Sequence, residues 1–185
     1  MTKKDQLFHT AKRLFVERGF HATPTSLIAE EAGVASGTLF YYFKTKEKLI
    51  NDLYLDTKNK MLKYVMQGVE GERSVRSMIR RLWLNFLLWG LNETQDYQFV
   101  KAYSNSLYID KLIREDAHTG FEPISQIINE GKRQEMIKNL DTQMLMNISL
   151  GTIFGTVDHL LEKNMYLEED FTRDAFAVFW DGIKL

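Results

Sequence analysis

Apolar residues recur every three or four positions along almost the whole chain, and this spacing predicts an all-α protein of about nine helices. The first apolar stripe runs from Leu7 to Phe15 and predicts a helix that ends at Gly19. No segment keeps the strict alternation of a half-buried strand, and the chain has only two prolines. The pattern therefore favours helices packed on helices.

Three further helices follow within the first third of the sequence. Thr23 is placed as an N-cap with Pro24 at the first helical position, and that helix is expected to run to about Ala32. A third helix is expected over about 36–43. A long fourth helix begins near Lys46.

Glycines at 68–72 suggest the first break in the helical pattern. We expect two domains: a helix-turn-helix head over 1–47, and a helical ligand-binding and dimerisation domain over 48–185. The expected helices beyond the break are at about 73–92, 95–103, 106–117, from near Pro123 to around 131–135, 141–163 and 168–182.

The most informative segment is 28–47, which has the pattern of two short helices joined by a glycine turn. Ala29 is small enough for the two helices to approach closely, Gly33 suits the tight turn, and Leu39 anchors the second helix from beneath. The polar and aromatic residues that remain are short enough to enter a DNA groove. This pattern predicts binding of double-stranded DNA.

Charge is distributed unevenly between the two ends. The formal net charge is only −1, but residues 1–50 hold eight Lys and Arg against five Asp and Glu, which leaves sixteen against twenty for the remainder. A basic head on an acidic body is expected when one end of a protein meets phosphates. Ordinary scatter of charge would explain the same counts, so the prediction of DNA binding rests mainly on the helix-turn-helix pattern of residues 28–47.

Residues 7–50 resemble the DNA-binding domain of the TetR family of bacterial transcriptional regulators. The matching positions include Leu14-Phe15, Gly19-Phe20, Ala32-Gly33-Val34, Ser36-Gly37-Thr38-Leu39 and Lys46-Glu47-Lys48-Leu49. The resemblance implies a homodimer whose paired recognition helices enter successive major grooves of a palindromic operator. It also implies a C-terminal domain that binds a small molecule. In most members this ligand releases a repressor from DNA.

Carried over position by position, the resemblance gives these candidate DNA contacts: Thr25, Ser36, Gly37, Thr38, Tyr41, Tyr42 and Lys46. Thr25 would bind a phosphate at the start of its helix, and Lys46 would meet another as a point charge. Gly37 would allow close approach of the backbone, and Thr38 could touch a thymine methyl. Phe40 replaces the tyrosine usual in the family, and we assign it to packing.

The C-terminal part is less informative. An aromatic-rich region predicts a largely apolar pocket for a lipophilic or aromatic effector, although aromatics at helical spacing also form ordinary cores. The candidate pocket residues are Met61, Tyr64, Trp83, Phe86, Phe99 and Tyr103.

The last two expected helices are apolar on more than one side, so a second subunit is expected to cover one of them. A core contained within one subunit remains the alternative. The candidate dimer contacts are Ile148, Gly151, Thr152, Gly155, Phe171, Ala175, Val178 and Phe179.

Other classes of protein receive little support. The absence of cysteine excludes disulfides and thiolate metal sites, and the four histidines lack metal-ligand spacing, so we expect no metal, no cofactor and no catalytic residue. No role follows for His118 or His159. The first residues lack the apolar run of a signal peptide, and the longest apolar stretch, Leu82 to Leu91, contains Asn85 and is too short to span a bilayer. Both observations favour a cytoplasmic protein without a membrane partner. A helical scaffold that has lost DNA binding stays open as an alternative function.

Overall fold

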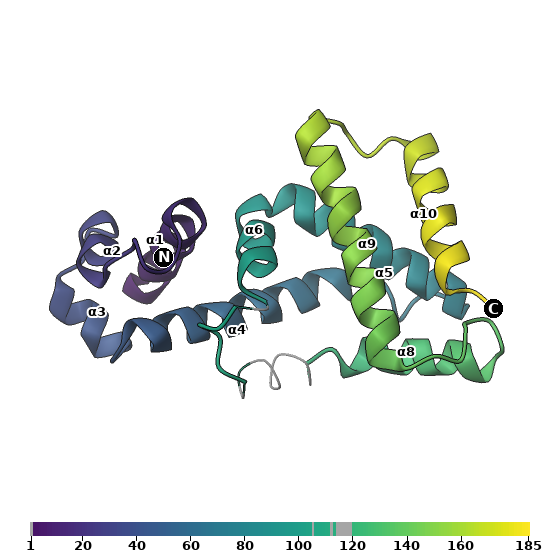
Figure 1. Ribbon diagram of the computed structural model, residues 1–185, viewed down its shortest axis with the longest axis horizontal. Coiled ribbons are helices and arrows are strands. Elements are labelled where there is room, and N and C mark those ends of the chain that lie inside the picture. The colour runs from purple at the N-terminus through teal and green to yellow at the C-terminus, as the bar shows by residue number, and fades with distance from the viewer. Residues whose placement is uncertain (1, 105, 112, 114–119) are drawn as a thin grey trace. The chain divides into compact units, whose positions relative to one another are not determined.

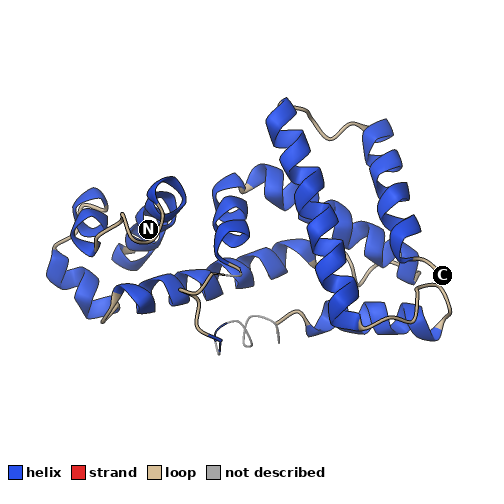
Figure 2. Ribbon diagram, in the orientation of Figure 1, coloured by secondary structure: helices blue, strands red, loops and turns tan. Residues whose placement is uncertain are grey.

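The computed structural model describes residues 2–104, 106–111, 113 and 120–185, and among these every regular element is a helix (Figure 2). The all-α fold class is therefore confirmed. The helices, labelled in Figure 1, are α1 (Lys3–Arg18), α2 (Thr25–Glu31), α3 (Ser36–Tyr42), α4 (Lys46–Val65), α5 (Val75–Asn92), α6 (Thr94–Tyr103), α8 (Glu122–Arg133), α9 (Thr142–Lys163) and α10 (Glu169–Ile183).

Local sequence explains where several helices begin and end. Thr2 and Asp5 form a reciprocal capping box at the start of α1. Gly19 ends that helix with a φ of 77°, a conformation that residues with a Cβ rarely adopt. Asp141 caps α9 by accepting a hydrogen bond from the backbone N–H of Met144 at 2.8 Å.

Two expectations for the elements were wrong. Thr23 is not the N-cap of α2, because Pro24 takes that position and the helix begins at Thr25. The Thr23 hydroxyl instead donates to the carbonyl oxygens of Leu14 and Gly19 inside the fold. The helix expected from about 106 does not begin there, because residues 106–110 form a turn; residues 111 and 113 are helical, and the rest of the 106–117 range lies outside the described residues.

The chain divides into two compact units. The first, which we call the head unit, combines residues 2–60 with the described part of 93–118. Its core joins residues of α1, α2, α3 and α4 to Phe99, Tyr103 and Ile109. A domain boundary after residue 47 stays a prediction, and the head unit is larger than that head.

The second unit, which we call the body unit, combines residues 61–92 with the described part of 119–185. Trp83 of α5 packs against Phe176 and Phe179 of α10, with ring centroids 5.5 and 6.2 Å apart. The buried Asn85 amide donates to the carbonyl oxygens of Val65, the last residue of α4, and Gln67, two residues beyond it, at 2.8 and 2.9 Å. Helix ends leave carbonyl groups without partners, so this side chain satisfies groups that burial would otherwise make costly.

Candidate nucleic-acid interface

Helices α2 and α3 form the helix-turn-helix that the sequence predicts. Ile28 and Ala29 of α2 and Leu39 of α3 are buried at 2 % exposure or less. Gly33 makes the turn between the helices with a φ of 66°. The N–H of Val34 donates to the Ala29 carbonyl at 3.0 Å, which closes the turn. The buried apolar residues fix the angle at which α3 presents its other side.

The outer side of α3 carries most of the candidate DNA contacts. Ser36 and Gly37 are exposed, and Thr38 is half-buried. A Cβ placed on Gly37 would meet nothing within 4 Å. Tyr41 and Tyr42 are 76 % and 38 % exposed, and their rings contact each other edge to face at 5.3 Å. The helix therefore presents small and aromatic side chains together, which suits a groove lined by base edges and phosphates.

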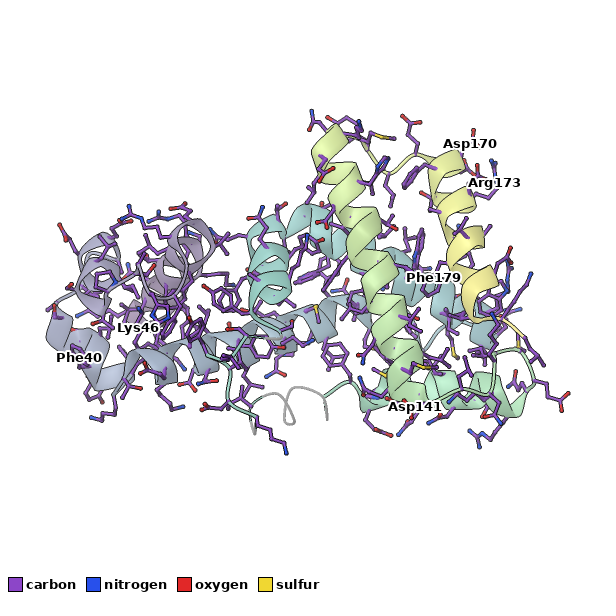
Figure 3. All side chains as sticks on the ribbon, viewed as in Figure 1. Phe40, Lys46, Asp141, Asp170, Arg173 and Phe179 are labelled. Carbon is purple, nitrogen blue, oxygen red and sulfur yellow. The ribbon has the colours of Figure 1, made fainter. Side chains whose placement is uncertain are left out.

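Phe40 does not pack in the core as we expected. Its side chain is 46 % exposed, whereas Leu39, the preceding residue, and Phe43, three residues later, are fully buried. Figure 3 labels Phe40 on the outer part of α3. The helical period explains the error, because Phe40 lies one turn after Ser36 and so shares the exposed side of the helix.

Lys46 is engaged within the head unit. Its ammonium donates to the Phe20 carbonyl oxygen and lies 4.2 Å from the centroid of the Phe20 ring. Partial burial lowers the pKa of Lys46 below its ordinary value. Both contacts hold the start of α4 against Phe20. A phosphate contact by the Lys46 ammonium stays a prediction.

Thr25 stands at the first position of α2 and is half-buried. Pro24, the N-cap, supplies no side-chain hydrogen bond to the first turn. First-turn N–H groups have no carbonyl partner within their own helix, so a phosphate could satisfy them.

The candidate pocket residues belong to both units. Phe99 and Tyr103 lie in the core of the head unit. In the body unit, Met61, Trp83 and Phe86 are buried. Tyr64 is half-buried, and its hydroxyl accepts a hydrogen bond from Asn92 at 3.0 Å. An effector pocket formed by these six residues stays a prediction.

Helices α9 and α10 border an open groove of about 480 Å³ in the body unit. It is lined by seven of the eight candidate dimer contacts, namely Ile148, Thr152, Gly155, Phe171, Ala175, Val178 and Phe179. Ile148 and Val178 are 53 % and 77 % exposed, whereas Phe179 is buried against Trp83. The eighth candidate, Gly151, is exposed on α9.

His159 also lines this groove and stacks on Phe171, with ring centroids 6.1 Å apart. Sequence reasoning gave it no role, although its place seven residues after Thr152 puts it on the same side of the helix. His118 lies outside the described residues. Among the described residues, no group of three His, Asp or Glu is arranged to hold a metal ion.

The family model described as "Bacterial regulatory proteins, tetR family" matches residues 7–53, and the model described as "Tetracyclin repressor-like, C-terminal domain" matches residues 76–184. The chain is 27 % identical over 177 residues to the HTH-type transcriptional regulator UidR of Escherichia coli K12, covering 95 % of this chain and 90 % of the relative.

Two solved structures extend the comparison over the whole fold. A putative tetR family transcription regulator from Shewanella sp. PV-4 superimposes with a TM-score of 0.93 at 28 % identity, covering 100 % of both chains. The transcriptional regulator FadR from Bacillus subtilis, solved in complex with stearoyl-CoA, gives a TM-score of 0.76 at 21 % identity, covering 97 % of this chain and 98 % of that chain.

Proposed function

The chain belongs to the TetR family of bacterial regulatory proteins and is a DNA-binding transcriptional regulator, and from this premise we propose that it is a homodimeric, ligand-released repressor in the cytoplasm. The single observation that carries the DNA-binding part is the division of α3 into two sides. Leu39 is fully buried, while Tyr41 and Phe40 are 76 % and 46 % exposed. Because its inner side stays packed in the core of the head unit, such a helix can place its outer side in a major groove.

Five of the seven candidate contacts divide between two tasks. Ser36, Gly37 and Thr38 begin α3 and lie where a recognition helix meets base edges. The Thr25 backbone and the phenol of Tyr42 would bind phosphates and fix the register of the helix on the duplex. Base contacts supply sequence preference, and phosphate contacts supply affinity that falls as salt rises.

Two subunits joined through α9 and α10 would give the repressor its twofold symmetry. Support comes from the exposed apolar side chains of Ile148 and Val178 beside the small residues Thr152 and Gly155. Small residues let a partner helix approach closely, and the apolar ones gain by leaving water. A dimer places two copies of α3 on half-sites about 34 Å apart, one helical turn of DNA.

The effector is proposed to be a lipophilic small molecule. Support comes from the stearoyl-CoA complex of the B. subtilis relative with the same fold. The apolar residues Met61, Trp83 and Phe86 stand in the body unit, which would hold such a ligand. Binding would favour a dimer whose two recognition helices no longer match the spacing of the half-sites.

The experiment begins with selection of DNA from a random duplex library by the purified full-length protein. We expect a palindromic duplex, bound with an affinity that falls steeply with salt. Stearoyl-CoA is then titrated into the complex, with free coenzyme A as the control for its charge, and we expect release only with the acylated form. Failure to recover any preferred duplex would refute sequence-specific DNA binding by this protein and favour a helical scaffold.

A further inference from the structure

The segment formed by α6 and the turn that follows it, residues 94–104 and 106–111, is fastened along the DNA-binding part of the head unit. We call this segment the strap. Near its start, Asp96 accepts a hydrogen bond from Lys12 of α1 at 2.5 Å, and both side chains are largely buried. Further along, the Tyr103 hydroxyl donates to the Phe15 carbonyl oxygen at 2.9 Å.

The far end of the strap is held by α4. The Asn51 side chain uses both of its groups on one residue: its amide donates to the Asp110 carboxylate at 3.1 Å, and its oxygen accepts from the Asp110 backbone N–H at 2.9 Å. Ile109, next to this clamp, is 1 % exposed and belongs to the core that contains Leu39 and Phe43. The turn therefore completes the core behind the recognition helix.

Between these attachments, Tyr108 lies on the residue that holds Lys46. Its ring stacks on Phe20 with centroids 4.3 Å apart and planes 18° from parallel, and it meets His21 edge to face at 5.2 Å. The same Phe20 supplies both the ring and the carbonyl oxygen that engage the Lys46 ammonium. Tyr108, Phe20 and Lys46 thus form one contact series from the strap to the first residue of α4.

This series bears on α3 because only three residues separate α3 from α4. The recognition helix has seven residues, too few to be stable in water without packing. Its C-terminal end is held by the buried Phe43, and Lys46, three residues later, contacts Phe20 outside α4. Because Lys46 contacts Phe20 through both its ring and its carbonyl oxygen, a change in the position of Phe20 would be passed to Lys46 and to the turn that ends α3.

We propose that Tyr108 is a positioning residue for DNA binding, which acts through Phe20 and Lys46 to hold α3 at the angle that fits the groove. The proposal rests on the proposed DNA-binding function and assigns part of that function to a residue far from the helix-turn-helix in sequence. The phenol ring is the part that matters, because stacking needs the ring and not the hydroxyl.

The test measures DNA affinity by fluorescence anisotropy, with full-length variants and the duplex selected by the wild-type protein. The free energy of one stacked aromatic pair corresponds to about a two- to tenfold change in affinity. We expect a loss of DNA affinity in that range for Tyr108→Ala. Tyr108→Phe should bind as the wild type does. Leu107→Ala is the matched control from the same turn, since Leu107 is 95 % exposed and should be silent.

A merely structural role for Tyr108 would lower thermal stability without coupling to Lys46. The second readout is therefore a double-mutant cycle in DNA affinity with Lys46→Met. We expect the double variant to bind no more weakly than Lys46→Met alone. Tyr108→Leu, which keeps an apolar side chain without a ring to stack, replaces Tyr108→Ala if the latter does not fold.

The outcomes are distinguishable. Wild-type affinity in Tyr108→Ala or Tyr108→Leu, or additive losses in the cycle, would overturn the positioning role and leave the DNA-binding function intact. If the wild-type protein prefers no duplex, the proposed function fails and this inference fails with it.

Discussion

Substitution of Val178 by aspartate should separate the two subunits without harming either one. The Val178 side chain is 77 % exposed in the single subunit and borders the groove between α9 and α10. A carboxylate at an exposed position remains in water and costs the isolated subunit little. In a dimer that covers the groove, the same carboxylate loses its water and faces apolar side chains.

The size of the effect follows from the exposed fraction. Full burial of a valine side chain is worth about 1.5–3 kcal/mol, so the exposed part of Val178 supplies about 1–2 kcal/mol for each subunit. Twofold symmetry repeats the contact, which gives about 2–4 kcal/mol for the dimer, or an increase of about 30- to 1000-fold in the dimer dissociation constant. Desolvation of two unpaired carboxylates adds to this figure.

Sedimentation equilibrium over a range of concentrations measures the dissociation constant directly. Ala177→Asp is the matched control, because Ala177 is the adjacent exposed residue on α10, outside the groove lining, and receives the same charge. We expect Val178→Asp to sediment as a monomer at concentrations where Ala177→Asp and the wild type are dimers, and to lose its affinity for a palindromic duplex. An unchanged dissociation constant in Val178→Asp, or an equal change in both variants, would refute the placement of the interface.

The remaining predictions concern the head unit. Thr38→Ala should cost about 1 kcal/mol of DNA affinity and relax preference at one base pair, whereas Tyr42→Ala should weaken all duplexes alike; competition with single-base variants of the selected duplex separates the two. Phe40→Ala should change the free energy of unfolding by no more than about 0.5 kcal/mol while lowering DNA affinity, and a large loss of stability in urea unfolding would instead place the ring in the core. Burial lowers the pKa of Lys58 to about 8. The unfolded chain therefore binds more protons than the folded one between pH 8 and 10.5, so stability should rise with pH over that range in the wild type, and Lys58→Met should reduce the rise.

Helical periodicity was sufficient for most of the fold. The stripe that ends at Gly19, the glycine turn at Gly33 and the long helix that begins at Lys46 all follow from residue spacing and from the few conformations open to glycine. Such signals are local, so the structure they predict does not depend on how the rest of the chain packs.

Features that depend on tertiary packing were predicted wrongly or not at all. Thr23 and Pro24 have the sequence pattern of a cap, yet the Thr23 hydroxyl donates to the carbonyl oxygens of Leu14 and Gly19, nine and four residues earlier. These contacts depend on how the chain folds back after Gly19, which the cap pattern does not indicate. Phe40 was assigned by its chemical type, and its exposure depends on which side of a seven-residue helix faces the core. The stacking of Tyr108 on Phe20 joins residues 88 positions apart, and no local signal in the sequence marks it.

The apolar surface of α9 is compatible with either a bilayer or a second protein, and the length and charge of α10 distinguish the two. Among the described residues, α9 is the one helix long and apolar enough to cross a membrane, and only 22 % of its most apolar window is buried. The groove, however, is shared with α10, which has 15 residues and is too short to span a hydrocarbon core about 30 Å thick. A bilayer that covered the groove would also have to take in the charged first turns of α10, where Asp170 and Arg173 pair at 2.6 Å (Figure 3). A protein surface can cover the apolar groove and leave those charges in water, which supports the proposal that a second copy of the α9–α10 pair covers the exposed face of α9.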